Sequence, residues 1–171
     1  KRLKPSCFHD YQLAAEQYTP QLWLYEGFTS YYDDLALVRS GLISTERYIS
    51  TLEKLLSRVT RNPSNSKQSL TDSSFNAWTK FYKQDENAAN AVVSYYAKGA
   101  LLALCLEAKL RTAGYSLQQL VRQLWQNYLT TGTPDDALSE VLQQLGLDEL
   151  ASLTSRWLTQ PEPLPLHQVL A

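Results

Sequence analysis

The sequence predicts an all-α fold, an irregular helical bundle, and three observations lead to this class. Residues that start and stop helices recur along the chain. Apolar residues fall at three- and four-residue steps, most clearly in Leu117, Leu120, Val121, Leu124, Trp125 and Tyr128. We find no convincing strand pattern and no internal repeat of fixed period, so neither a sheet nor a solenoid is expected.

The composition is that of a globular domain. Its 171 residues are 44% hydrophobic and include four Trp and eleven Tyr. A fold of this size buries roughly 70% of the surface of its unfolded chain, enough for a core without disulfides or structural metal. Sixteen Lys and Arg against 17 Asp and Glu give a net charge of -1. Without a basic excess, no nucleic-acid partner is expected.

The first helices are predicted from their boundaries. One is expected over residues 19–40, because Thr19 is a capping residue, Pro20 suits the first helical position, and Gly41 ends the pattern. A second is expected over residues 44–61. The polar segment that follows predicts a surface loop.

The middle of the chain holds its most apolar segment. A short helix around Trp78 is expected over residues 72–82. Residues 89–112 predict the core helix, which Gly114 ends.

Three shorter helices are predicted in the last third. Ser116 and Gln119 form a capping box that opens a helix continuing to Tyr128. Residues 133–145 follow, with acidic residues in the first turn, at the positive end of the helix dipole. Residues 148–159 form the last predicted helix.

The chain divides into a helical part and a tail. Residues 1–160 are expected to form the helical domain and residues 161–171 an extended, Pro-rich exit segment. Pro161, Pro163 and Pro165 oppose further helix there. This tail is expected to be a linker or the edge of a following domain.

Cysteines and apolar runs add little about function. Cys7 and Cys105 lack metal-type spacing, and Cys105 is expected to be a buried small hydrophobe. We recognise no signal peptide and no apolar stretch of about 20 residues, so no membrane span is expected. The localisation stays open, with cytoplasm and periplasm both possible.

Residues 22–34 have an unusual composition for a core helix. Glu26 stands among aromatic residues such as Trp23 and Phe28, and Gly27 costs about 1 kcal/mol relative to Ala inside a helix. A carboxylate buried there needs a partner or a metal. Composition alone leaves two interpretations open: a metal or catalytic ligand, or a salt-bridged core glutamate.

The segment Trp-Leu-Tyr-Glu-Gly-Phe-Thr-Ser-Tyr-Tyr (residues 23–32) resembles the part of gluzincin zinc peptidases that follows their HExxH motif and supplies the third zinc ligand. It is most similar to the glycyl aminopeptidase family. Further stretches fit this family in order, at residues 1–5, 33–41, 73–78, 85–87 and 94–99. The resemblance implies that Glu26 is a zinc ligand and that the bundle is the C-terminal helical part of a thermolysin-like (gluzincin) catalytic domain.

The chain departs from the family pattern in two ways. It contains no HExxH, which in the family precedes the segment at residues 1–5, so two histidine ligands and the general-base Glu are missing. His9 and His167 lie in segments expected to be irregular, and a lone carboxylate cannot hold zinc, which takes about three protein ligands at a catalytic site. Asn76 also stands where the family usually has Asp.

The second site residue implied by the resemblance is Tyr96. In related zinc aminopeptidases a Tyr two residues before Lys-Gly stabilises the oxyanion of the tetrahedral intermediate, and Tyr96 is favoured over Tyr95 for this role. If both implied residues serve one zinc, Glu26 and Tyr96 must open into the same concavity. Gly27 and Gly99 are then expected where the two helices come close.

The resemblance implies a zinc aminopeptidase that removes N-terminal residues, such as Gly or other small residues, from peptides. Alone, this chain is expected to be inactive, to bind zinc weakly, and to self-associate through apolar surface around Trp23, Phe28 and Tyr96. In the family a PDZ-like module commonly follows. The alternative is a noncatalytic helical interaction module that uses its four Trp residues for a core and a binding groove.

Overall fold

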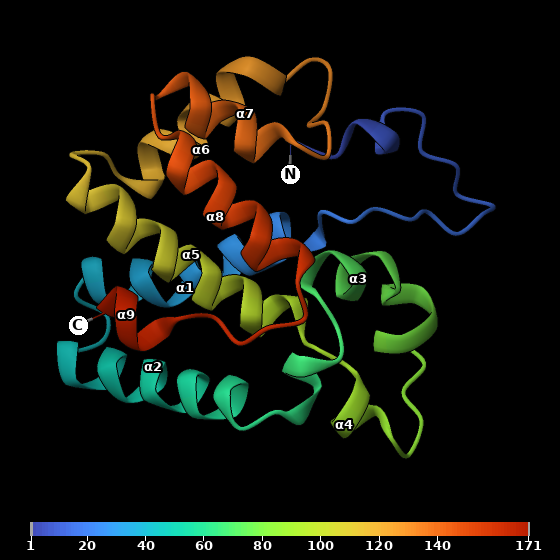
Figure 1. The fold of residues 1–171 in the computed structure, drawn as a ribbon, viewed down its shortest axis with the longest axis horizontal. Coiled ribbons are helices and arrows are strands. Elements are labelled where there is room, and N and C mark those ends of the chain that lie inside the picture. Colours follow the sequence, from blue (N-terminus) through green and yellow to red (C-terminus); the bar gives the residue numbers. More distant parts are fainter. Residues whose placement is uncertain (1, 171) are drawn as a thin grey trace.

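The computed structural model describes residues 2–170, which fold into a bundle of helices (Figure 1). Within that range no strand forms, and the one isolated β-bridge joins Pro5 to Thr133. The predicted all-α class is confirmed. The α-helices are α1 (Phe28–Arg39), α2 (Thr45–Thr60), α3 (Leu70–Phe75), α4 (Ala88–Ala91), α5 (Tyr95–Thr112), α6 (Leu117–Tyr128), α7 (Ala137–Gln144), α8 (Asp148–Thr159) and α9 (Leu166–Leu170). The shorter elements are the 3₁₀ helices η1 (Ser6–Phe8) and η3 (Pro63–Ser66) and the π-helices η2 (Trp23–Gly27) and η4 (Ala77–Phe81).

Serine caps begin four of the helices. In each, the serine hydroxyl accepts a hydrogen bond from the backbone N–H three residues later, as the capping rule requires. The caps are Ser44, Ser69, Ser94 and Ser116. A cap of this kind contributes about 1 kcal/mol. Because its hydrogen bond spans only three residues, the start of each of these helices is determined by the local sequence.

Helix α5 is the centre of the core. Its side chains from Leu101 to Leu106 are almost all buried, and Leu110 is fully buried. The helix packs against η2 and α1 and also contacts α2, α3, α6, α8 and α9. In Figure 1 it crosses the middle of the bundle, with α2 on one side and α6 and α7 on the other.

The expected core helix over residues 89–112 is broken, which corrects the sequence prediction. Between α4 and α5 the chain is extended, with Val92 at φ −110° and ψ 121°. The Val93 N–H donates to the Gln68 side-chain oxygen at 2.8 Å, and the Ser73 hydroxyl donates to the Val93 carbonyl at 2.6 Å. These long-range bonds replace those that a continuous helix would make.

The tail also differs from the extended segment expected over residues 161–171. Leu164 and Leu166 are buried, and α9 packs on α5. Pro165 precedes the first residue of α9, where its fixed φ suits a helix start and its missing N–H costs nothing. The prolines therefore prevent α8 from continuing into this segment, but they allow a new helix to start after Pro165. Residue 171 lies outside the described range.

One segment of the described chain, Ala88–Thr112, is long and apolar enough to cross a membrane when judged by length and composition alone. This differs from the expectation that no such stretch exists. Burial inside the protein covers 61% of the window, and the core helix of a soluble protein meets the same criterion. Its apolar character is accounted for by the place of α5 in the core.

Candidate functional site

Glu26 lies in a π-helical turn that leads into α1. The π-helix η2 spans Trp23–Gly27, and Phe28 continues as regular α-helix. At the start of the turn, the Trp23 N–H donates to the Ser74 hydroxyl at 3.0 Å, which ties η2 to α3. Single π turns inside helices are frequent at functional sites.

The backbones of η2 and α5 are in direct contact. A Cβ placed on Gly27 would lie 2.6 Å from the Cα and 2.7 Å from the carbonyl carbon of Gly99. A Cβ on Gly99 would lie 2.9 Å from the carbonyl oxygen of Trp23. Real Cβ atoms do not approach so closely, so both positions require glycine. The predicted close approach at these two glycines is confirmed.

This contact brings Glu26 within electrostatic reach of Tyr96. The Glu26 side chain is half-buried next to Gly27, and Tyr96 precedes Gly99 by one helical turn. Burial, a hydrogen bond to Tyr82 and the negative charge of Glu26 raise the pKa of Tyr96 to about 12. At neutral pH the phenol is therefore protonated and can donate a hydrogen bond.

Three tyrosines form one hydroxyl cluster at the start of α5. The Tyr82 hydroxyl lies 3.1 Å from that of Tyr95 and 3.3 Å from that of Tyr96. The rings of Tyr95 and Tyr96 stack at 4.6 Å, and Phe81 packs on both. Sequence reasoning missed Tyr82, because its contact with α5 arises from the path of the chain through η4 and carries no local signal.

Tyr96, not Tyr95, reaches a cavity. Tyr95 is 1% exposed, and burial raises its pKa far above the ordinary value. Tyr96 is half-buried and lines a cavity of about 300 Å³ between α1, α2 and α5. The other residues that line it are Ser30, Asp34, Thr51, Lys54, Leu55, Arg58, Ala97 and Ala100.

Glu26 is not among the residues that line this cavity. It stands one helical turn before Ser30, whose hydroxyl donates to the Glu26 carbonyl at 2.8 Å. Glu26, Ser30 and Asp34 are spaced four residues apart and so follow one side of the helix. Glu26 is within electrostatic reach of Tyr96 but does not share its cavity, so the expected common concavity is not found, and the metal and oxyanion roles of the two residues stay predictions.

The described residues hold no group of three His, Cys, Asp or Glu side chains that could bind a metal. A ring nitrogen of His9 lies 3.2 Å from the Thr130 carbonyl oxygen, and His167 lies in α9. Within residues 2–170, Glu26 can therefore supply one carboxylate of the roughly three ligands that a catalytic zinc site takes.

Asn76 has a structural role that an aspartate could not fill in the same way. It is the residue that ends α3, and its side-chain amide donates to the Asp72 carbonyl at 2.9 Å. An ionised aspartate has no hydrogen to donate there. The departure from the family pattern at this position thus coincides with a helix-end hydrogen bond.

Two of the three residues around which exposed apolar surface was expected, Trp23 and Phe28, are buried. Trp23 is 2% exposed and Phe28 is 5% exposed, with their ring centroids 6.0 Å apart. Both rings belong to the core of this chain, because the turn at η2 directs them inward against α5. These two rings therefore do not provide the exposed surface expected of them, and self-association of the chain stays a prediction.

Two comparisons relate the chain to known proteins. Residues 1–102 match the family model described as M61 glycyl aminopeptidase. The crystal structure of an aminopeptidase N family protein from Idiomarina loihiensis is 45% identical, with a TM-score of 0.94 over 99% of this chain. This chain spans 30% of that one. No curated protein matches. Since the family model covers more than half of the 171 residues, the chain belongs to the M61 glycyl aminopeptidase family.

Proposed function

We propose that this chain is part of a zinc-dependent aminopeptidase that removes N-terminal residues from peptides, with Gly or other small residues preferred. The observation that carries the proposal is the backbone contact between Gly27 and Gly99, which brings Glu26 within electrostatic reach of Tyr96. Membership of the family supports the peptidase class. The preference for small residues rests on family resemblance alone.

Glu26 is the residue of this chain that would hold the zinc. It presents a half-buried carboxylate near the start of a core helix, and carboxylate oxygen is an accepted zinc ligand. Bound zinc would supply Lewis-acid polarisation of the peptide carbonyl. The histidine pair and the general-base Glu of HExxH are proposed to come from outside these 171 residues, since the sequence lacks that motif.

Tyr96 would stabilise the negative charge that develops on the oxygen of the scissile carbonyl. Its hydroxyl carries a proton at neutral pH, as an ordinary phenol does, and the pKa of about 12 keeps it protonated at alkaline pH as well. The Tyr82 hydroxyl at 3.3 Å and the stacked Tyr95 ring hold the phenol in place before substrate arrives. A fixed donor aimed at a developing charge lowers the barrier without reorganisation during the reaction.

Comparing this chain with a longer protein tests the proposal. We expect a protein that contains both HExxH and these residues to hydrolyse a glycyl anilide with zinc. The 171-residue chain alone should show no turnover and should bind zinc no better than a surface carboxylate does. Tight, stoichiometric binding of zinc by the 171-residue chain, or turnover by it, would contradict this assignment. A zinc-loaded longer protein that cleaves no N-terminal residue would contradict it as well.

One observation favours the alternative of an interaction module. Trp78 is 40% exposed and Trp125 is 38% exposed, so two of the four tryptophans face solvent. The Trp78 ring nitrogen donates to the Gln17 carbonyl at 3.0 Å, which fixes that ring against the N-terminal segment. Substituting both by Ala distinguishes the two functions, because peptidase activity of the longer protein should survive and partner binding should not.

A further inference from the structure

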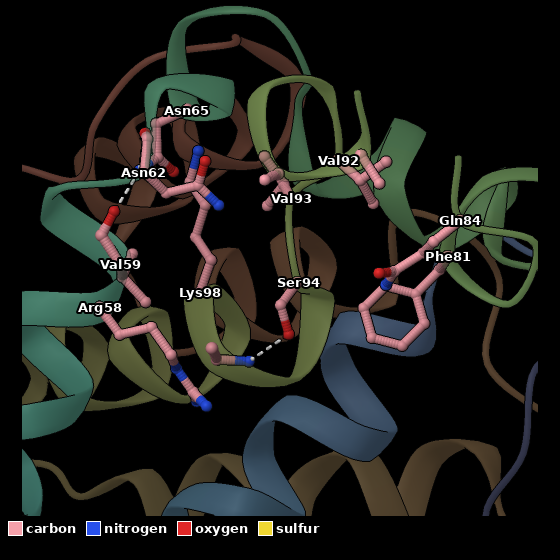
Figure 2. A pocket seen from close by; sticks show the side chains of 13 residues that line it. Arg58, Val59, Asn62, Asn65, Phe81, Gln84, Val92, Val93, Ser94 and Lys98 are labelled. Carbon is pink, nitrogen blue, oxygen red and sulfur yellow. Dashed lines mark hydrogen bonds between the residues drawn. The ribbon is translucent and has the colours of Figure 1, made fainter. Parts of the chain in front are cut away.

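A second cavity adjoins the one that Tyr96 lines. It encloses about 320 Å³ between the end of α2, the segment before α5 and the first turn of α5 (Figure 2). Arg58 and Ala97 line both cavities, so the two meet there. Phe81 also lines the second cavity, and its ring centroid lies 5.8 Å from that of Tyr96. The Phe81 ring therefore contacts Tyr96 and also lines the second cavity.

The second cavity is positively charged. Its thirteen lining residues include Arg58 and Lys98 and the amides Asn62, Asn65 and Gln84, and none of the thirteen is Asp or Glu. The N-terminal end of α5, an 18-residue helix, also opens here, because Ser94 and Ala97 line the cavity. The positive end of a helix dipole adds to the two cationic side chains.

Lys98 is a buried cation with donors to spare. It is 1% exposed, and its ammonium donates to the Glu162 carbonyl at 2.9 Å, which accounts for one of three N–H groups. In Figure 2 its side chain extends from α5 toward Asn62 and Asn65. Burial lowers the pKa of Lys98 to about 8, so most of it stays charged at neutral pH.

The negative charge of Glu162 favours the charged form of Lys98, but the Glu162 carboxylate is itself paired with Arg156. The Glu162 carboxylate is held by the Arg156 guanidinium at 2.9 and 3.1 Å, and it is Glu162's backbone carbonyl that receives Lys98. A buried cation is costly unless it is well paired, and a bound anion would add to the stabilisation that Glu162 provides. The cavity thus has the chemistry to accept a carboxylate.

We propose that this second cavity binds the C-terminal carboxylate of the peptide substrate, with Arg58 as its direct partner and Lys98 as a buried positive charge behind it. The inference rests on the proposed aminopeptidase function and names its substrate class. An extended peptide advances about 3.3–3.6 Å per residue. We expect a short peptide with its scissile bond at Tyr96 to reach Arg58 with its C-terminal carboxylate, so that short peptides with a free C terminus are the preferred substrates.

The test compares a glycyl dipeptide with its C-terminal amide, using the longer protein that contains HExxH. The amide keeps the shape of the substrate and removes the negative charge. We expect kcat/KM for the free acid to exceed that for the amide by about 10- to 100-fold, the range for a hydrogen bond to a charged group. Arg58→Gln should bring this ratio close to one, whereas Arg58→Lys should keep part of it because the charge remains.

Arg61→Gln is the matched control. Arg61 lies one turn further along, directly after α2, is exposed, and is not among the residues that line either cavity. Its substitution removes the same charge and should leave the ratio unchanged. Equal turnover of acid and amide by the unmodified protein, or an unchanged ratio in Arg58→Gln, overturns the subsite and leaves the aminopeptidase function standing. Absence of turnover of both peptides overturns the function and the subsite with it.

Discussion

Gly27 and Gly99 face each other so closely that a Cβ on Gly27 would lie 2.6 Å from the Cα of Gly99. This contact sets the distance between η2 and α5, and with it the position of Glu26 relative to Tyr96. Each glycine makes its helix less stable by about 1 kcal/mol than Ala would at the same position. That loss is offset by a backbone approach that no larger residue permits.

Gly27→Ala should destabilise the chain. Helix propensity alone predicts a gain of about 1 kcal/mol. The new methyl would instead meet Gly99 backbone atoms that cannot rotate away, and overpacking of this kind costs about 1–3 kcal/mol. Chemical denaturation should show a fall of about 2 kcal/mol in the free energy of unfolding. Asp33→Ala, at an exposed position of α1, should stay within about 0.5 kcal/mol. A stabilised Gly27→Ala would contradict the observed contact.

Glu26→Gln should weaken zinc binding in the longer protein. The amide keeps the shape of the side chain but replaces a charged ligand with a neutral one. Loss of an outer-shell partner typically costs 10- to 100-fold in metal affinity, so loss of a ligand should cost at least about 100-fold. Competition with a chelator measures the zinc affinity of the variant and of the unmodified protein. Asp33→Asn removes an acid from α1, the helix that follows η2, and should leave the affinity unchanged. Equal zinc affinity in both variants would exclude Glu26 as a ligand.

Tyr96→Phe and Tyr95→Phe should have different effects, because the two hydroxyls have different surroundings. Removing an oxyanion donor costs about 10²- to 10³-fold in kcat, so Tyr96→Phe should lose activity on this scale with little change in KM. Tyr95 is buried and shares its hydroxyl with Tyr82 at 3.1 Å. Its loss should lower stability by about 1 kcal/mol and leave kcat within a few-fold. The reverse pattern would assign the oxyanion role to Tyr95.

The parts of the fold that could be predicted depend on local signals. Ser44 and Ser116 begin helices where the sequence predicts them, because a cap acts within three residues of its own position. A close approach at Gly27 was predicted because glycine inside a helix needs a reason, whereas Gly99 was predicted only through the resemblance that pairs Glu26 with Tyr96. The expected positions of Glu26 and Tyr96 came from resemblance to a family and not from periodicity.

The parts that could not be predicted depend on distant contacts. The break before α5 is made by Gln68 and Ser73, which bond to Val93 from 25 and 20 residues away. Trp23 and Phe28 gave no sign of which face would be buried, since their segment is apolar on several sides. Tyr82 and Arg58 reach Tyr96 and its cavities from other elements, so no motif around Tyr96 includes them.

The buried charge of Lys98 should make the stability of the chain depend on pH. Burial lowers its pKa from 10.5 to about 8 in the folded chain, so the unfolded chain holds a proton between pH 8 and 10.5 that the folded chain has lost. Stability then rises with pH across this window, by up to about 3 kcal/mol at 1.36 kcal/mol per pKa unit.

Lys98→Met removes this gain, so the free energy of unfolding of the unmodified chain relative to that variant should rise from pH 8 to 10.5. Tyrosines titrate in both proteins, and the difference between the two cancels their contribution. Lys80→Met, at an exposed position, should keep the pH slope of the unmodified chain. Denaturant titrations at several pH values measure the effect, and parallel slopes for the unmodified chain and Lys98→Met would show that Lys98 is not a destabilising buried charge.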